Sequence, residues 1–267
     1  MNSTATFSHR YRDWSVAEWG RLFQDRDMFL DTIHGVIGRR VLLNFRIEPE
    51  VMAKALPKPF RPKLYRGKAI GGVCMIRFEG LRPRFAPGWM GMASENAAHR
   101  VAVEWEEEGR LREGVFIPQR NTASHFNKMM GGRVFPGVFS MSEFEVREAE
   151  DSVSIRIVDA QGVEQVRFAG DAAAEHRAGS VFPTLEEAAN FFSLGATGYS
   201  LAGDGRTFEG MELRSLSWKI APMKATEAYS RWFAREDVFP RGSVEFDCAL
   251  VMRNIPHEWH SRPRISL

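Results

Sequence analysis

Glu95 is the side chain with the clearest chemical potential in this sequence, within the stretch GMASENAAHRVAVEW. It opens a strand-like pattern beside Asn96, among small residues that would leave space around a carboxyl group. A carboxylic acid that faces a cavity is desolvated, which raises its pKa and suits it to general acid catalysis. Strand alternation could also turn this side chain outward to solvent, and periodicity alone favours that second interpretation.

Basic side chains elsewhere could form a polar pocket for a small carboxylate. The ligand-binding candidates are Arg39, Arg46, Arg120, His125, Arg133 and Phe135. Further aromatic residues that could line such a pocket are Phe45, Trp105 and Phe116. Each basic residue also has a structural interpretation, because arginines commonly lie along a surface or pair with Glu, and a histidine can cap a short helix.

A metal site is the weaker interpretation of the segment PHEWHSRP, in which His257 and His260 are three residues apart. A helix could offer both imidazoles to one ion, but Pro256 and Pro263 bracket the segment closely. We expect an exposed tail anchored by its tryptophan, and we predict no metal and no cofactor.

The two cysteines, Cys74 and Cys248, each stand alone in an apolar, strand-like run. This pattern is typical of buried, inert thiols in a reducing compartment and differs from a disulfide framework. The sequence also contains no GxSxG nucleophile motif and no GxGxxG phosphate loop.

Most of the chain has the pattern of strands separated by turn residues, which favours a closed or nearly closed antiparallel sheet with short helices. The predicted strands are 39–47, 68–79, 93–106, 110–118, 138–147, 151–159, 164–175, 207–219 and 243–253. The predicted helices are an amphipathic leader over 15–32 and shorter segments over 49–56, 122–130, 185–194 and 224–235.

Composition excludes several classes of function. The 36 Lys and Arg against 34 Asp and Glu give a net charge of +2, and the basic residues are scattered, so nucleic acid is not an expected partner. No apolar run is long enough for a signal peptide or a membrane span. We expect a cytoplasmic protein that does not bind membranes.

Three segments in order carry a family resemblance: GRRVLLNFRIEPEVMAKALPKPF, SENAAHRVAVEW and NKMMGGRVFPGVF. Together they resemble the acetoacetate decarboxylase-like superfamily, in particular its branch of bacterial proteins of unknown function, over roughly residues 35–255. The resemblance implies a mostly β fold, a cone-shaped antiparallel β-barrel with short helical decorations. It also implies that the last segment forms a corner at the mouth of the barrel.

The resemblance implies less about chemistry than about fold. In true acetoacetate decarboxylases two lysines follow the aromatic-Pro pair, and one forms a Schiff base with the substrate ketone. Those positions here are Gly137 and Val138, so a Schiff-base mechanism is not expected. Glu95 matches the strand-opening glutamate of the superfamily and Arg39 or Arg40 its early arginine, whereas a second glutamate has no clear match.

Two functions follow from these observations. The protein could be an enzyme that binds a small oxo or carboxylic acid in the barrel and moves a proton through Glu95, or a non-catalytic small-ligand binder or sensor. We expect a leader over 1–34, one barrel domain over 35–255 and a tail over 256–267. Because the superfamily assembles and the leader has an apolar face, a homo-oligomer is also expected.

Overall fold

One mixed sheet of 13 strands and two short helices make up the part of the chain that this computed structural model describes. The described residues are 32–83, 87, 89, 91–125, 136–215 and 217–266. The predicted leader helix, except its last residue, and most of the predicted helix over 122–130 lie outside them.

The strands account for most of these residues. They are β1 (Thr32–Ile47), β2 (Arg61–Pro62), β3 (Leu64–Tyr65), β4 (Lys68–Pro83), β5 (Met92–Glu107), β6 (Arg110–Thr122), β7 (Phe139–Glu148), β8 (Ser152–Asp159), β9 (Glu164–Ala172), β10 (Thr197–Leu201), β11 (Thr207–Ser215), β12 (Ala221–Ser230) and β13 (Val244–Ser266). The prediction of a mostly β, closed sheet is confirmed, although the pairs β6–β7 and β6–β10 are parallel.

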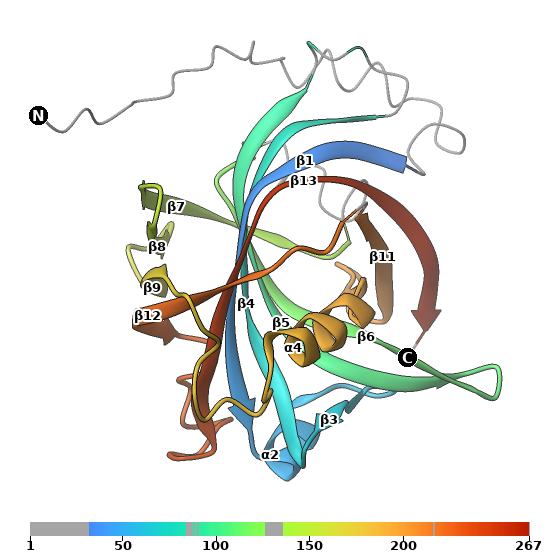
Figure 1. Cartoon of the computed structure of the whole chain (residues 1–267). Helices are drawn as coiled ribbons and strands as arrows, with labels where there is room; N and C mark the ends of the chain where they lie inside the picture. The colour runs from blue at the N-terminus through green and yellow to red at the C-terminus, as the bar shows by residue number, and fades with distance from the viewer. Residues whose placement is uncertain are drawn as a thin grey trace, which may run out of the picture.

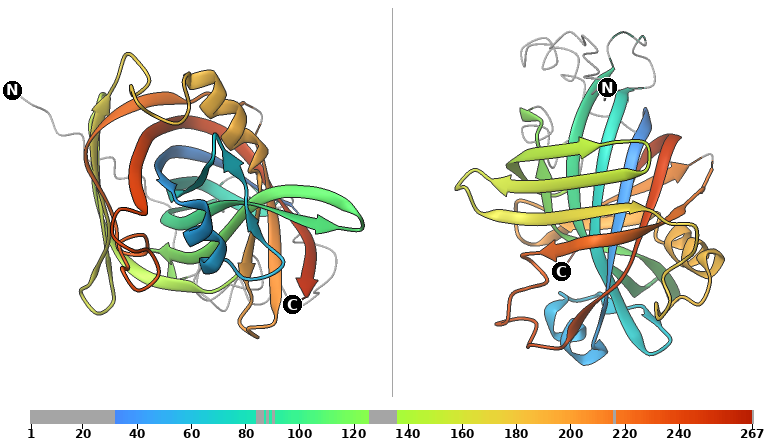
Figure 2. Two further views of the ribbon diagram at one scale, coloured as in Figure 1. Left: turned by 90° about the horizontal axis from the view of Figure 1, so that it is seen from below. Right: turned by 60° about the vertical axis from the view of Figure 1, so that its left-hand side comes forward.

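The sheet closes into two rings that share a wall. The first ring, here called the pocket barrel, runs through β6, β5, β4, β1, β13, β11 and β10 and back to β6. The second ring leaves β6 through β7, β8, β9 and β12 and rejoins the wall at β13. Figure 1 shows β7, β8 and β9 on one side of the shared strands and β11 on the other. In the right-hand view of Figure 2, β7, β8 and β9 cross in front of the shared strands.

A hydrophobic core lies on each side of the shared wall. Val41, Leu43 and Met75 belong to one cluster of buried side chains, and Leu42, Cys74 and Ile76 belong to the other. Strands covered on both faces need apolar side chains at successive positions. This requirement explains the uninterrupted apolar runs of the shared strands.

The two described helices begin and end where local signals predict. Helix α2 (Pro49–Ala55) starts with a proline in its first turn, and the pair of prolines after it stops further helical turns. Helix α4 (Leu185–Leu194) is capped by the Thr184 side chain, which accepts a hydrogen bond from the Glu187 amide. Its buried face, which includes Phe191 and Phe192, packs against the core of the pocket barrel.

Two predicted elements are wrong. The segment 224–235, predicted as a helix, lies mostly in strand β12, which pairs with β9. The predicted tail over 256–267 is instead part of β13 as far as Ser266, paired with β1 and β11.

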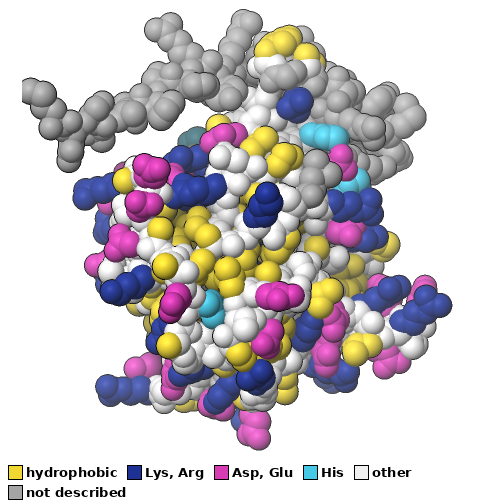
Figure 3. All heavy atoms as spheres, viewed as in Figure 1, with side chains coloured by type: hydrophobic (Ala, Val, Ile, Leu, Met, Phe, Trp, Pro, Cys, Tyr) yellow, Lys and Arg dark blue, Asp and Glu magenta, His cyan; other side chains and the backbone are white. Residues whose placement is uncertain are grey.

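No helix in the described ranges is long and apolar enough to cross a membrane. On the face in Figure 3, acidic and basic side chains are interspersed.

Candidate functional site

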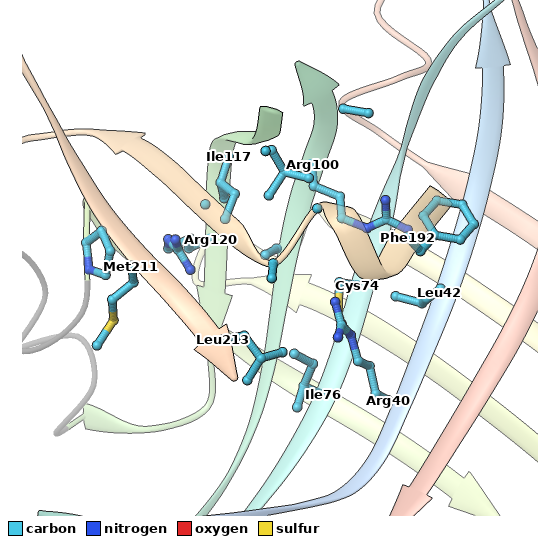
Figure 4. Close-up of a pocket in the computed structure, with 18 of the residues that line it drawn as sticks. Arg40, Leu42, Cys74, Ile76, Arg100, Ile117, Arg120, Phe192, Met211 and Leu213 are labelled. Atoms are coloured by element: carbon cyan, nitrogen blue, oxygen red, sulfur yellow. The ribbon is translucent and has the colours of Figure 1, made fainter. Parts of the chain in front are cut away.

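A cavity of about 100 Å³ lies inside the pocket barrel, between the shared wall and helix α4. Its walls come from β1, β4, β5, β6 and β11, and most of the lining is apolar. The polar exceptions are three arginines, Arg40, Arg100 and Arg120, and the thiol of Cys74 (Figure 4), together with Lys63, Asn96 and Glu113.

Strand register explains why these four residues meet. Leu42, Cys74, Ala98 and Arg120 form one row across four neighbouring strands, because each is the direct partner of the next. Arg40 and Arg100 stand two positions from this row, on β1 and β5, and therefore face the same side as Leu42 and Ala98. The small side chain of Ala98 leaves room between the arginines.

Arg40 lies against the thiol of Cys74. Its Nε donates a hydrogen bond to Sγ at 3.0 Å, and its guanidinium carbon lies 5.2 Å from the centre of the Trp218 ring. The buried Nη1 of Arg40 has no hydrogen-bond partner. This guanidinium therefore keeps one unused donor nitrogen.

Arg100 is almost wholly buried, with 4 % of its surface exposed. Its Nη2 donates to Asn44 Oδ1 at 2.5 Å, the guanidinium lies over the Phe192 ring, and Nε has no partner. Burial lowers the pKa of Arg100 to about 10, so the group remains charged at neutral pH.

Arg120 completes the group from β6. Its Nε donates to Ser200 Oγ at 3.1 Å, and its guanidinium carbon lies 5.5 Å from the centre of the Phe139 ring. Burial lowers its pKa to about 10 as well. Within the ranges given above, none of the three arginines forms a salt bridge with a carboxylate; the nearby Glu113 pairs with Lys63 at 2.5 Å.

Glu95 is placed on the opposite face of β5. Its neighbour Asn96 lines the cavity, but the Glu95 carboxylate accepts hydrogen bonds from Arg39 at 2.6 Å and Arg77 at 2.8 Å. The expectation that Glu95 faces the cavity is therefore wrong for this cavity. Glu95 is an ion-pair partner of Arg39 and Arg77.

Arg39 belongs to the same charged cluster and not to the cavity. It is 1 % exposed and also donates to Glu148 at 3.1 Å. Although burial pushes the pKa of Glu148 upward, hydrogen bonds from Arg253 and Arg39 hold it below its usual value. The cluster joins β1, β4, β5, β7 and β13 across the second ring.

The other predicted site residues are dispersed. Arg46 pairs with Glu245 near the surface, and His125 is exposed just beyond the end of β6. Arg133 and Phe135 lie outside the described residues. The aromatic candidates Phe45, Trp105 and Phe116 are buried in the core on the other side of the shared wall. Of the predicted ligand-binding set within the described ranges, only Arg120 lines the cavity.

The glycine-rich corner reaches the cavity through Pro136 and Phe139, which both line it. Between them, Gly137 has a φ of +77°, and a Cβ there would lie 2.5 Å from the Ser200 Cβ, so only glycine fits. Its amide donates to Glu209 at 3.1 Å. The Val138 side chain is exposed. Neither position offers an amine to the cavity.

The paired histidines do not share a face of their strand. His257 and His260 lie on strand β13, where side chains three positions apart face opposite sides. Burial lowers the pKa of His257 to about 4, and its ring packs against Phe78. No group of three or more potential metal ligands occurs among the residues that the structure places.

Arg100 and Cys74 were not predicted as cavity residues, and Arg40 was named only as the alternative to Arg39 for the early arginine of the superfamily. A signal for Arg100 existed, because with His99 it interrupts the apolar residues from Ala97 to Val103 in a strand buried on both faces. A charge in such a run is buried, and buried charges need a partner or a ligand. No comparable signal in the sequence marked Cys74. Its burial was predicted, but the residues that surround it in the fold were not.

Comparison with known proteins identifies a family. The family model DUF2071, described as an uncharacterized conserved protein, matches residues 38–247. No curated protein matches the chain significantly.

Solved structures show the same fold at low sequence identity. Acetoacetate decarboxylase from Legionella pneumophila is 10% identical, with a TM-score of 0.57 over 96% of this chain and 92% of that one. An acetoacetate decarboxylase-like enzyme from Sphingomonas wittichii RW1 is 11% identical, with a TM-score of 0.56 over 89% and 93%. The enduracididine biosynthesis enzyme MppR complexed with pyruvate is 9% identical, with a TM-score of 0.51 over 88% and 89%. The likeness shows an acetoacetate decarboxylase-like fold.

Proposed function

This chain belongs to the DUF2071 family, and we propose that it binds a small carboxylic acid, oxo acids included, inside the pocket barrel. One observation carries the proposal: three guanidinium groups border one cavity and none is paired with a carboxylate in the described structure. A ligand carboxylate supplies the missing partner.

Electrostatics supports an anionic ligand. A buried charge without a counter-charge costs several kcal/mol, and a bound carboxylate offsets that cost through charge-assisted hydrogen bonds. Among the residues that the structure describes, Arg40 Nη1 and Arg100 Nε have no hydrogen-bond partner, so each keeps an unused donor for such a ligand. The charge of the site therefore selects acids over neutral molecules of the same shape.

The volume and the apolar lining of the cavity limit the size and polarity of the ligand beyond its carboxylate. The cavity of about 100 Å³ is smaller than the roughly 150 Å³ engineered cavity that holds benzene. Apolar side chains, among them Ile76, Leu213 and Phe192, surround the arginines. A short acid with a few carbon atoms fits both features. The MppR complex with pyruvate supports the idea that this fold can hold such a molecule.

The arrangement supports binding without requiring turnover. Glu95, the predicted proton donor, is paired with arginines on the far side of the wall. The proposal therefore covers both an enzyme and a non-catalytic sensor. We propose that neither of them forms a Schiff base with the ligand. Lys63, a lysine in the cavity lining, is engaged in an ion pair with Glu113.

A thermal-shift screen tests the binding function. We expect short 2-oxo, 3-oxo and aliphatic carboxylic acids to raise the melting temperature, because a ligand of the native state stabilises it by about 2.7 kcal/mol at 100 times its dissociation constant. The matching amides should have no effect. Arg100→Gln should abolish the shift, whereas Arg46→Gln, which changes an arginine outside the cavity, should leave it intact. Equal shifts for acids and amides would refute the proposal.

Borohydride trapping tests the absence of a Schiff base. If no lysine forms an imine, protein treated with pyruvate or acetoacetate and then borohydride keeps its mass, because only an imine is reduced to a stable adduct. Mass spectrometry of the wild type and of Lys63→Arg is the measurement. A mass increase that disappears in the variant would show that Lys63 forms an imine after all.

A further inference from the structure

Cys74 occupies the centre of the arginine group. It sits in the same row as Ala98 and Arg120 and accepts the Arg40 Nε hydrogen bond at 3.0 Å. Figure 4 shows the thiol beside the Arg40 guanidinium at the cavity wall. Cys74 is 3 % exposed and lines the cavity, so its thiol can meet only a molecule that enters the cavity beside the Arg40 guanidinium.

A second observation, independent of the cysteine, points to a ligand at the same place. Arg100 is 4 % exposed, lines the cavity, and has an Nε without a partner and no carboxylate to neutralise it. It projects from the strand adjacent to that of Cys74, two residues beyond Ala98, the direct partner of Cys74. A carboxylate bound by Arg100 and Arg120 would therefore lie close to the sulfur.

We propose that Cys74 is a nucleophile toward the bound acid, and that the acid is a short 2-oxo acid held reversibly as a thiohemiketal. This inference rests on the carboxylate-binding function proposed above. In a 2-oxo acid the electrophilic carbonyl carbon is bonded directly to the carboxylate, so anchoring the carboxylate brings that carbon to the thiol.

The addition balances without any further reactant. The sulfur forms a bond to the carbonyl carbon, the carbonyl π electrons move to the oxygen, and the thiol proton ends on that oxygen. Arg40, whose Nη1 has no partner, stabilises the negative charge that develops on the oxygen. The reverse steps release the unchanged acid.

The other cysteine provides an internal control. Cys248 is 0 % exposed, is not part of the cavity lining, and burial raises the pKa of its thiol. Its sulfur accepts a hydrogen bond from Asn44 Nδ2 at 3.5 Å. In the folded protein it should remain unmodified while Cys74 reacts.

Charge-matched alkylation tests whether a bound carboxylate presents a carbon to Cys74. Iodoacetate and iodoacetamide form the same type of S–C bond with loss of iodide, but only iodoacetate carries a carboxylate. Relative to glutathione measured in parallel, we expect Cys74 to favour iodoacetate by about tenfold or more, since a site of opposite charge raises the local reagent concentration. Peptide mapping assigns the modified cysteine. Modification of Cys74 without this preference, or no modification in the folded protein, would overturn the proposal.

An arginine variant separates binding from reactivity. Arg120→Gln should remove the preference of Cys74 for iodoacetate over iodoacetamide, because only the anionic reagent gains from the local positive charge. Pyruvate should slow both reagents in the wild type. A preference for iodoacetate that survives in Arg120→Gln would contradict the proposed geometry.

Nuclear magnetic resonance with pyruvate labelled at its carbonyl carbon tests the adduct directly. Wild-type protein should give a signal from a tetrahedral carbon that is absent with Cys74→Ser and Cys74→Ala. If acids stabilise the wild type and both variants equally and no such signal appears, Cys74 is not a nucleophile but carboxylate binding stands. If acids do not stabilise the wild type, the proposed function itself is refuted.

Discussion

Arg39 and Arg100 are both buried, but their surroundings differ. Arg39 is surrounded by the carboxylates of Glu95 and Glu148. Arg100 has an amide oxygen, a phenylalanine ring and no carboxylate. A charge that the fold leaves unneutralised lowers stability, and such a residue persists where it serves a ligand. This difference indicates a structural role for Arg39 and a binding role for Arg100.

Replacing each of these arginines by methionine should have opposite effects on stability. Arg39→Met removes one of the guanidinium partners of Glu95 and Glu148, which keep Arg77 and Arg253, and should lower the free energy of unfolding by about 2 kcal/mol. Arg100→Met should leave that free energy unchanged or raise it by about 1 kcal/mol, and should abolish stabilisation by small acids. Urea unfolding followed by tryptophan fluorescence measures both. A loss of about 3 kcal/mol in Arg100→Met would make this arginine structural.

The site was only partly predictable at this scale. Arg120 was identified as a ligand-binding candidate, but its partners come from strands far apart in the sequence, and their side-chain directions depend on register shifts such as the one between Ile37 and Arg39. A one-residue shift moves a side chain to the other face of a sheet. Arg39 and Arg40 are adjacent on β1 and so face opposite sides, but the sequence alone could not decide which of them faces the cavity.

The elements were predicted better than the site. Strands with long apolar runs and helices with N-terminal signals, such as Thr184 before α4, were found close to their observed bounds. The segment 224–235 contains good helix formers, but pairing of β12 with β9 overrides that local preference. Prolines suggested that β13 ends early, yet pairing with β1 and β11 keeps Pro256 in an extended strand.

Glu148 connects strand β7 to the shared wall and should make that connection sensitive to acid. Its pKa is lowered in the folded state, so it contributes stability above the unfolded pKa of about 4.5, and this contribution is lost as pH falls through the folded pKa. Glu148→Gln should therefore be less stable than wild type at pH 6, with a difference that shrinks below about pH 4.5.

A surface pair on the same strand provides the control for this prediction. Glu145 also lies on β7 and pairs with Arg156, but half of its side chain is exposed. Glu145→Gln should change the free energy of unfolding little at any pH, because exposed pairs contribute about 0–1 kcal/mol. Urea titrations from pH 7 to 3 measure both variants. A constant difference for Glu148→Gln across this range would contradict the prediction.

At the scale of the whole molecule, two buried histidines should make the fold sensitive to mild acid. Burial lowers the pKa of His99 to about 3 and that of His257 to about 4, from the ordinary histidine value of about 6.5. Below pH 6.5 the unfolded chain binds protons that the native state does not. The free energy of unfolding therefore decreases as the pH is lowered. Each histidine contributes about 1.4 kcal/mol per pH unit between roughly pH 6 and 4.

Histidine variants test this pH dependence. His257→Leu should reduce the slope of the unfolding free energy between pH 6 and 5 by about half, because it removes one of two groups. His125→Gln, a change at an exposed histidine, should leave the slope unaltered. The measurement is urea unfolding at half-unit steps of pH. If the free energy of unfolding has the same slope against pH in His257→Leu and in the wild type, His257 does not contribute to that slope.

The double closure of the sheet also has a consequence for how the protein folds during synthesis. Val41 of β1 pairs with Val251 of β13, so neither ring can close until about 200 residues of intervening chain have left the ribosome. Until then the apolar edges of β1 and β12 remain open to other chains. Nascent copies should therefore depend on chaperones while β13 is still being made, and fold only after it emerges.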